Sequence, residues 1–167
     1  MAQDVGAFRT QLLAEKGDPA QVLIEVSDMR RRITEAKKPT GPWDTRLGAG
    51  RLQQIELIAQ ASSLMTGNTG RDVASGLSAG VAISWLDDAD RAALMRAYAL
   101  CWQVQQVARL LGDKPLDPPQ IGAGGTSFVL RETGYTNIGA LQQALETTTA
   151  EASTVIDHLL ARPPREI

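Results

Sequence analysis

The sequence contains very few of the residues on which disulfides and metal centres depend, and it has no long apolar run. Cys101 is the single cysteine, so the chain cannot form an intramolecular disulfide. One cysteine and one distant histidine, His158, are too few ligands for a zinc site. No apolar stretch approaches the roughly 20 residues that a membrane-spanning helix needs. The N-terminus lacks a charged region followed by an apolar signal core. We therefore expect a cytoplasmic protein without membrane contact.

Neither sign of charge dominates, and aromatic residues are scarce. The 17 basic and 19 acidic side chains give a net charge of −2, without the basic excess of nucleic-acid-binding surfaces. Aromatic residues make up 4% of the chain, segments with the alternation typical of strands are nearly missing, and residues that favour helices are abundant. We therefore expect an all-α protein that does not bind nucleic acid, and 167 residues suit a single domain.

Apolar residues recur at helical spacing along most of the chain. Residues 1–42 are predicted to be connecting helices and a linker, with helices over 4–16 and 19–37. The bundle core is predicted over 43–161, with helices over 52–66, 71–84, 87–111, 127–132 and 137–161. Residues 162–167 are interpreted as a tail consistent with the end of a natural chain. The pattern favours an antiparallel helical bundle of about five to six helices.

The stretch WDTRLGAGRLQQIELIAQ, residues 43–60, organises the rest of this prediction. Its start, near 43–48, is expected to be a short extended linker, because Pro42 and the β-branched Thr45 disfavour helix there. Gly48 and Gly50 then interrupt the chain. From Leu52 onward apolar residues cover nearly every direction around a helix, which is typical of a helix packed on most sides.

Glu56 and Gln60 are the polar exceptions in this helix. Because they are four residues apart, they project from the same face, and a buried carboxylate needs a hydrogen-bonding or charged partner. One interpretation is structural: Glu56 pairs with an arginine of the bundle and Gln60 fixes a loop. The other is that both residues face a neighbouring domain and help to form a site there.

A basic run, Arg30 to Arg32, lies outside the apolar stripe of the 19–37 segment. These side chains can form a solvated face of the helix. Alternatively, Arg30 or Arg32 reaches acidic groups or nucleotide phosphates of another domain.

Three other features are interpreted as structural. Cys101 lies on the apolar face of the 87–111 segment, which favours a small core residue over a reactive thiol. Gly76 and Gly80, four residues apart, would let another helix approach closely. The GAGG sequence at 122–125 is expected in a loop, and it lacks the strand and the Lys-Ser/Thr that give phosphate-binding loops their mechanism. No residue of this chain is predicted to be catalytic or to bind a cofactor or metal.

The organising stretch resembles part of a known enzyme family. The residues that carry the likeness are Trp43, Asp44, Arg46, Leu47, Gly48, Gly50, Leu52, Ile55, Glu56, Ala59 and Gln60, preceded by Asp18, Pro19, Met29, Arg30, Arg32 and Ile33. They are similar to the segment of bifunctional glutamine synthetase adenylyltransferase/adenylyl-removing enzymes where a nucleotidyltransferase domain passes into its helical companion. The resemblance covers nearly the whole chain, and it suggests the companion of the C-terminal, adenylylating domain.

Two positions depart from the family pattern. A second glycine is replaced by Arg51 and an acidic residue by Gln54, which puts any catalytic or metal-supporting role of that acid in doubt. The family's catalytic signature, Gly-Ser followed by two aspartates one residue apart, is absent from the sequence. The isolated chain is therefore expected to be inactive.

The resemblance implies a parent enzyme that uses ATP and magnesium to move AMP onto glutamine synthetase in nitrogen regulation. Implied partners are the nucleotidyltransferase domain, glutamine synthetase and the PII signal protein. The residues expected to face another domain or a ligand are Arg30, Arg32, Arg46, Glu56 and Gln60. Two alternatives remain open: a stand-alone helical adaptor that has lost the catalytic domain, and a module that senses glutamine around Glu56 and Gln60.

Overall fold

A computed structural model describes residues 18–162, and within that range it contains six helices and no strand. The helices are α2 (Pro19–Ala36), α3 (Leu52–Thr66), α4 (Val73–Ala82), α5 (Asp88–Leu111), α6 (Gly122–Thr133) and α7 (Ile138–Ala161). The prediction of an all-α fold is confirmed. The predicted helix over 4–16 and residues 163–167 of the predicted tail lie outside the described residues.

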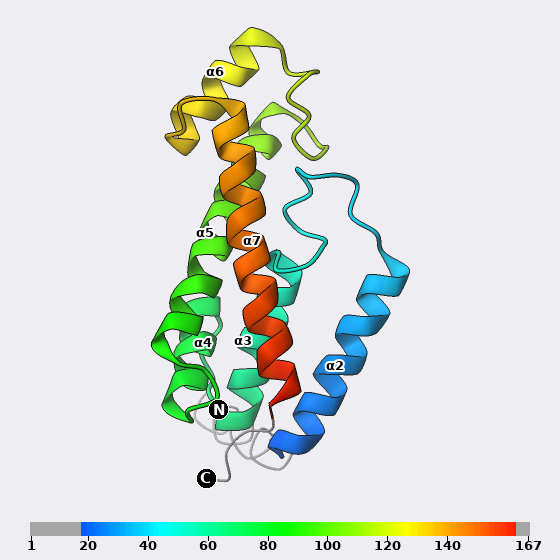
Figure 1. Cartoon of the computed structure of the whole chain (residues 1–167), viewed down its shortest axis with the longest axis vertical. Helices are drawn as coiled ribbons and strands as arrows, with labels where there is room; N and C mark the ends of the chain where they lie inside the picture. The colour runs from blue at the N-terminus through cyan, green and yellow to red at the C-terminus, as the bar shows by residue number, and fades with distance from the viewer. Residues whose placement is uncertain (1–17, 163–167) are drawn as a thin grey trace, which may run out of the picture.

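The long helices are antiparallel to their neighbours, as Figure 1 shows. Helices α2 and α5 run in one direction, α3 and α7 run in the other, and α6 covers one end of the α5–α7 pair. Short α4 packs on α3, α5 packs along α7, and α2 packs on α3. None of the helices in the described range is long and apolar enough to cross a bilayer.

Local sequence signals set most of the helix ends. Asp87 and Asp90 form a reciprocal capping box at the start of α5, and Asn137 accepts a hydrogen bond from the Ala140 N–H at the start of α7. Helices α3 and α6 end at Gly67 and Gly134, both in the left-handed conformation that glycine adopts at little cost. These termini follow from residue types that are visible in the sequence.

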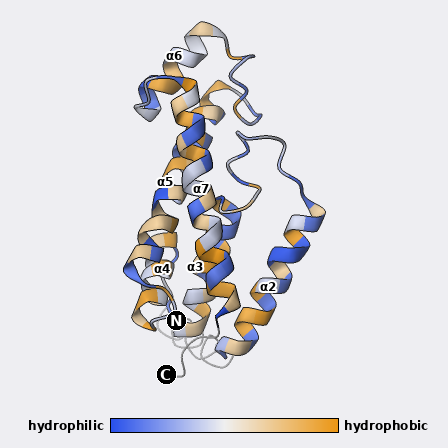
Figure 2. Cartoon of the chain, viewed as in Figure 1, coloured by the Kyte–Doolittle hydropathy of each residue, from blue (hydrophilic) through white to orange (hydrophobic). Residues whose placement is uncertain are grey.

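The core consists of two hydrophobic clusters arranged along the bundle. The first joins α2, α3, α4, the first half of α5 and the end of α7. The second joins Trp43, Leu52, the second half of α5, α6 and the first half of α7. Figure 2 shows the corresponding mixture of apolar and polar residues along α2, α5 and α7. Because α5 and α7 contribute to both clusters, they connect the two ends of the molecule.

Glycines allow α4 to lie very close to α3, as the sequence predicts. A Cβ atom added to Gly76 would lie 2.5 Å from the Ala59 carbonyl oxygen, and one added to Gly80 would lie 2.6 Å from the Ser62 hydroxyl oxygen. Real Cβ atoms do not approach other atoms so closely. The two glycines thus serve helix packing.

Cys101 is fully buried in the second cluster, as expected. Burial raises the pKa of its thiol to about 12, and the nearby Arg51 guanidinium offsets only part of that effect. Cys101 is therefore a core residue and not an activated nucleophile.

Two sequence predictions of local structure are wrong, and the contacts within each segment give the reason. Residues 43–48 are not extended but form a run of bends and turns, organised by the Asp44 side chain. Helix α6 begins at Gly122, not at Ser127, so the GAGG sequence lies inside the helix. There Gly125 packs so tightly on Ile121 that a Cβ would lie 2.7 Å from the Ile121 Cβ.

Only some of the apolar positions in α2 and α7 are buried. In α2, Val22, Leu23 and Val26 are buried, whereas Met29 is exposed. In α7, Thr149 and Ile156 are buried, whereas the neighbouring Thr148 and Val155 are partly exposed.

Candidate functional site

The centre of the candidate site is the linker loop, residues 40–51, which connects α2 to α3. The buried Asp44 carboxylate organises it with both oxygens. Oδ2 accepts hydrogen bonds from the Thr40 N–H and hydroxyl, and Oδ1 accepts from the N–H groups of Arg46 and Leu47. An aspartate that binds backbone N–H groups two and three residues ahead stabilises a turn. Asp44 is therefore fully engaged in shaping the loop.

Arg51, the last residue of the linker loop, contacts residues at the start of the loop. Its Nη1 donates to the main-chain oxygens of Asp44 and Gly41, and its side chain covers Gly48. Hydrogen bonds from a charged guanidinium are stronger than those between neutral groups. Arg51 thus holds the start of the loop against the start of α3.

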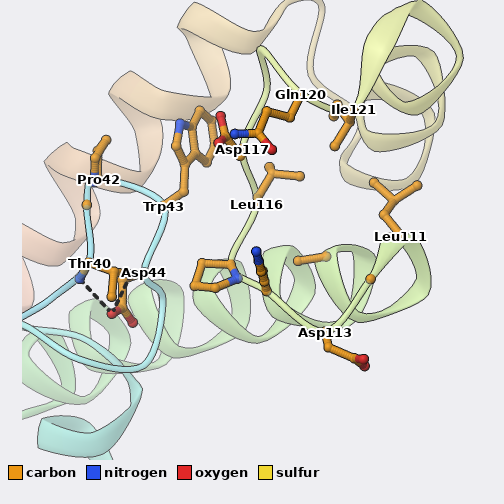
Figure 3. A pocket seen from close by; sticks show the side chains of 15 residues that line it. Thr40, Pro42, Trp43, Asp44, Leu111, Asp113, Leu116, Asp117, Gln120 and Ile121 are labelled. Atoms are coloured by element: carbon orange, nitrogen blue, oxygen red, sulfur yellow. Dashed lines mark hydrogen bonds between the residues drawn. The ribbon is translucent and has the colours of Figure 1, made fainter.

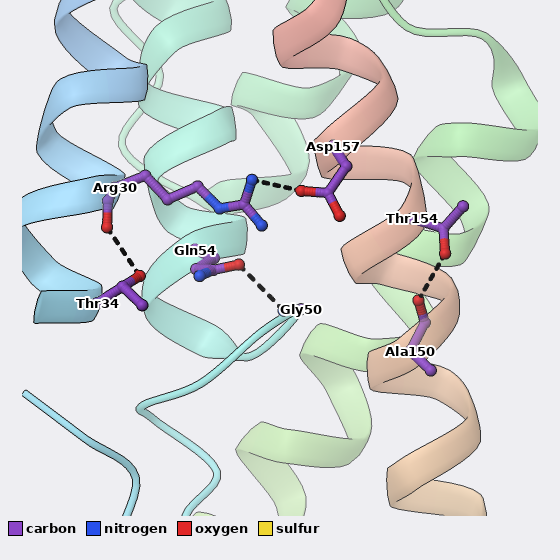
Figure 4. A network of polar contacts seen from close by, with 7 residues as sticks. All are labelled: Arg30, Thr34, Gly50, Gln54, Ala150, Thr154 and Asp157. Carbon is purple, nitrogen blue, oxygen red and sulfur yellow. Dashed lines mark hydrogen bonds and ion pairs between the residues drawn. The ribbon is translucent and has the colours of Figure 1, made fainter.

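Gln54 and Gly50 fix the point where the loop enters α3. Gln54 is buried, and its Oε1 accepts a hydrogen bond from the Gly50 N–H at 3.1 Å, as Figure 4 shows. Gly50 has a φ of +66° and lies against the backbone of α7 at Thr149 and Ser153. The N–H groups of Leu52 and Gln53 donate to the carbonyls of Thr45 and Arg46, which satisfies donors that a helix start leaves unpaired.

The three arginines predicted to face another domain are placed differently from one another. Arg30 is mostly buried, and its Nη1 donates to the Asp157 carboxylate, which joins α2 to α7 (Figure 4). Arg32 is exposed and pairs with Asp28 one turn earlier in α2. Arg46 is exposed, and the structure gives its side chain no hydrogen bond or ion pair among residues 18–162. Among the three, Arg46 is the most available to a partner.

Glu56 and Gln60 do share one face of α3, but they are less buried than expected. Glu56 is half-buried and Gln60 is exposed. Neither has a hydrogen-bond or ion-pair partner in the described part of the chain, so the pairing of Glu56 with an arginine is not found there. Both line a cavity of about 810 Å³ between α3, α4 and α5, together with Asn68, Arg71, Asp72 and Tyr98.

The polar groups around this cavity carry both signs of charge. Burial, and then the negative charges of Glu56 and Asp72, raise the pKa of the Tyr98 hydroxyl. Asp72 and Asn68 are engaged locally: Asp72 accepts from the Ser75 N–H, and Asn68 donates to Ser75. Glu56, Gln60, Arg71 and Tyr98 are the groups that a small polar ligand could contact.

A second cavity, of about 760 Å³, lies between residues 40–44 and the connection after α5. Figure 3 shows Trp43 beside Asp117 and Gln120, with Leu116 close by. Trp43 and Leu116 are buried members of the second hydrophobic cluster. The charged residues that line the cavity are of both signs: Asp44, Asp113, Lys114 and Asp117. We assign this region to the packing of the linker loop on the end of α5.

The linker loop does not fit a magnesium ion. Magnesium is bound through carboxylate and water oxygens, but position 54 holds the neutral Gln54, whose oxygen accepts the Gly50 N–H. The Asp44 oxygens accept four hydrogen bonds, and the cationic Arg51 lies next to them. Over residues 18–162 no group of three or more His, Cys, Asp or Glu side chains could hold a metal.

The sequence directs attention to this loop but not to its key contacts. Arg51 and Gln54 were visible only as departures from the family pattern, and their roles depend on main-chain atoms brought close by the turns. Gln53 is a further residue that sequence reasoning did not select. Its Oε1 is buried without a hydrogen-bond partner in the described structure.

The chain matches several curated proteins, all over only a small part of their length. It is 31% identical to the bifunctional glutamine synthetase adenylyltransferase/adenylyl-removing enzyme of Rhizobium meliloti over 144 residues, which is 81% of this chain and 14% of that protein. The enzyme of the same name from Agrobacterium fabrum is 29% identical over 149 residues, 85% of this chain and 15% of that protein.

A third match extends over nearly the whole chain. The Mesorhizobium japonicum enzyme of the same name is 28% identical over 168 residues, covering 96% of this chain and 16% of that protein. No protein-family model matches the sequence. Over most of its length, the chain is therefore related to one segment of the bifunctional glutamine synthetase adenylyltransferase/adenylyl-removing enzymes.

Proposed function

We propose that this chain is a helical companion domain of a nucleotidyltransferase that adenylylates and deadenylylates glutamine synthetase in nitrogen regulation. The observation that carries the proposal is the extent of the match: 81–96% of this helical chain corresponds to only 14–16% of each of the three relatives. The chain thus corresponds to one helical segment of a much larger enzyme. Its role is to orient the catalytic domain and to offer surface to partners such as glutamine synthetase and PII.

In this proposal the chemistry belongs to another part of the enzyme. ATP and magnesium would be bound by the nucleotidyltransferase domain, because the linker loop of this chain uses Gln54 and Arg51 for internal hydrogen bonds. The helical domain would act by fixing the orientation of the catalytic domain. The linker loop sets the angle between α2, which precedes it, and α3, which follows it.

The first test is an assay for AMP transfer by the isolated chain. We expect no radioactivity on glutamine synthetase after incubation of the chain with magnesium, glutamine synthetase and ATP labelled at the α-phosphate. The full-length Agrobacterium fabrum enzyme serves as the positive control in the same buffer. Label transferred by the isolated chain would show that chemistry is wrongly assigned to another domain.

A second candidate function is recognition of glutamine in the cavity around Glu56 and Gln60. The groups there suit a free amino acid: the Glu56 carboxylate can accept hydrogen bonds from the α-ammonium group, Arg71 can donate to the α-carboxylate, and Gln60 can pair with a side-chain amide. All three line the same cavity. This function is compatible with the first, because a companion domain can also respond to a metabolite.

Calorimetric titration tests the glutamine site directly. If the cavity binds glutamine, heat is expected at millimolar ligand or below, and Arg71→Met should abolish it without changing the melting temperature, because Arg71 is exposed. Arg91→Met, a change of the same kind at the start of α5 and outside the cavity lining, is the matched control. An absence of heat with the wild-type chain at millimolar glutamine would contradict the proposal.

A further inference from the structure

An aromatic pair borders the cavity of about 810 Å³ between α3, α4 and α5. Tyr98 lines the cavity. The ring of Trp102, one turn further along α5, stacks on the Tyr98 ring, with 6.4 Å between the ring centroids and 8° between the ring planes. Trp102 is 46% exposed, and the faces of aromatic rings attract cations. The pair thus gives the cavity a rim on which a flat cationic group can stack.

The oxygen atoms that line this cavity include unpaired acceptors. Among residues 18–162, neither the Glu56 carboxylate nor the Tyr98 hydroxyl has a hydrogen-bond partner. Both are accessible, because Gln53 Oε1 is the one buried side-chain nitrogen or oxygen of the described residues that lacks a partner. Gln60, one turn after Glu56, adds a further acceptor to the same lining. The cavity therefore suits a ligand that donates several hydrogen bonds.

The charge of the lining is negative. Glu56 and Asp72 are its two acidic side chains and Arg71 is its one basic side chain, which gives a net charge of −1. Arg71 is exposed and forms no ion pair with any described residue. Burial, and then the carboxylates of Glu56 and Asp72, raise the pKa of the Tyr98 hydroxyl, and no cation offsets this effect there. The local charge therefore favours a cationic occupant.

Shape and hydrogen bonding select a guanidinium group among the possible cations. A guanidinium is planar, carries five N–H donors, binds a carboxylate through two parallel hydrogen bonds and stacks on aromatic rings. An ammonium group is a compact, strongly hydrated charge that cannot stack in this way. Leu64, Val73 and Met95 supply apolar surface in the lining. They can cover the aliphatic stem of an arginine side chain.

We propose that this cavity binds the guanidinium group of an arginine. The guanidinium donates to the Glu56 carboxylate and stacks on the Tyr98–Trp102 pair, and the aliphatic stem lies along the apolar lining. An arginine side chain of a protein and the free amino acid share this chemistry, and the experiment distinguishes them. This inference goes beyond the companion-domain function and does not depend on it.

The experiment is an NMR titration of the ¹⁵N-labelled 167-residue chain with Nα-acetyl-L-arginine N-methylamide. At millimolar ligand we expect the indole N–H signal of Trp102 to shift, whereas those of the buried Trp43 and Trp85 stay in place. Trp102→Phe assigns the signal. The corresponding citrulline derivative has a similar shape without the charge and should cause no shift. Tighter binding of free L-arginine than of the blocked form would identify the amino acid as the source, and equal or weaker binding a protein side chain.

Two substitutions and their controls test the contacts. Glu56→Gln should lower the affinity at least about tenfold, because it removes a hydrogen-bonded charge. It should not lower the melting temperature, because Glu56 has no partner among the described residues. Glu146→Gln, on the exposed side of α7 and outside the cavity lining, should leave the affinity unchanged. Trp102→Ala should weaken binding about threefold, whereas Leu110→Ala, at an exposed position of the same helix, should not.

Arg71→Met separates this ligand from glutamine. The substitution should abolish glutamine binding, but it should not lower the affinity for the blocked arginine, because the cavity loses a cation that repels the guanidinium. Equal binding of the citrulline derivative, equal affinity of the Glu56→Gln variant, or a lower affinity of the Arg71→Met variant would each overturn the proposal. None of these outcomes decides whether the isolated chain transfers AMP, so the companion-domain function is tested separately.

Discussion

Replacing Gly50 with alanine is expected to lower the free energy of unfolding by about 3 kcal/mol or more, the sum of two separate costs. Gly50 has a φ of +66°, which disfavours any residue with a Cβ atom. The added Cβ would also overlap the Thr149 carbonyl oxygen and the Ser153 nitrogen. These are backbone atoms of α7, so the clash cannot be relieved by a side-chain rotation. Urea unfolding followed by circular dichroism measures the loss.

Gly112→Ala is the matched control for this substitution. Gly112 ends α5 in an extended conformation, and a Cβ added there would have no atom within 4 Å. We expect its free energy of unfolding to change by less than about 0.5 kcal/mol. If Gly50→Ala were as stable as Gly112→Ala, the close approach of the linker loop to α7 would be wrong.

This position shows what the sequence could and could not establish about the linker loop. Gly48 and Gly50 were recognised as an interruption before a buried helix, and α3 does begin at Leu52. The neighbour that requires glycine at position 50 is Thr149, about 100 residues away in the sequence. Local residue preferences carry no information about such a contact, so the sequence identified the break but not its cause.

The helices themselves were predictable where strong local signals agree with the apolar spacing. Asp87 and Gly112 mark the two ends of α5, and Asn137 marks the start of α7. The prediction failed in α6, where three of the first four residues are glycines of low helix propensity. There the burial of Val129 and Thr133 and the close packing of Gly125 on Ile121 outweigh the intrinsic preference.

The candidate site was predictable as a region and not as a set of contacts. Glu56 and Gln60 share a face, as their spacing requires, but how deeply they are buried depends on how α4 and α5 pack. Arg30 was considered for a partner outside the chain, whereas its carboxylate partner is Asp157 of α7. Ion pairs between distant segments follow from the packing of helices, which a single sequence does not specify.

Replacing Trp85 with alanine is the second substitution for which we expect a large effect, a loss of about 3–5 kcal/mol in the free energy of unfolding. Trp85 is 4% exposed and belongs to the first hydrophobic cluster. Its indole Nε1 donates to the Leu159 carbonyl oxygen at 3.3 Å, which joins the turn between α4 and α5 to the last turns of α7. Chemical denaturation measures the loss, and the indole fluorescence of the variants identifies the signal of Trp85.

Two further variants separate the sources of this stability. Trp85→Phe keeps most of the aromatic surface but removes the N–H donor, so we expect it to cost only about 1–2 kcal/mol. Trp102→Ala removes the same side chain from the exposed face of α5, where 46% of Trp102 is accessible, and should cost less than about 1 kcal/mol. Equal losses for Trp85→Ala and Trp102→Ala would contradict the placement of Trp85 in the core.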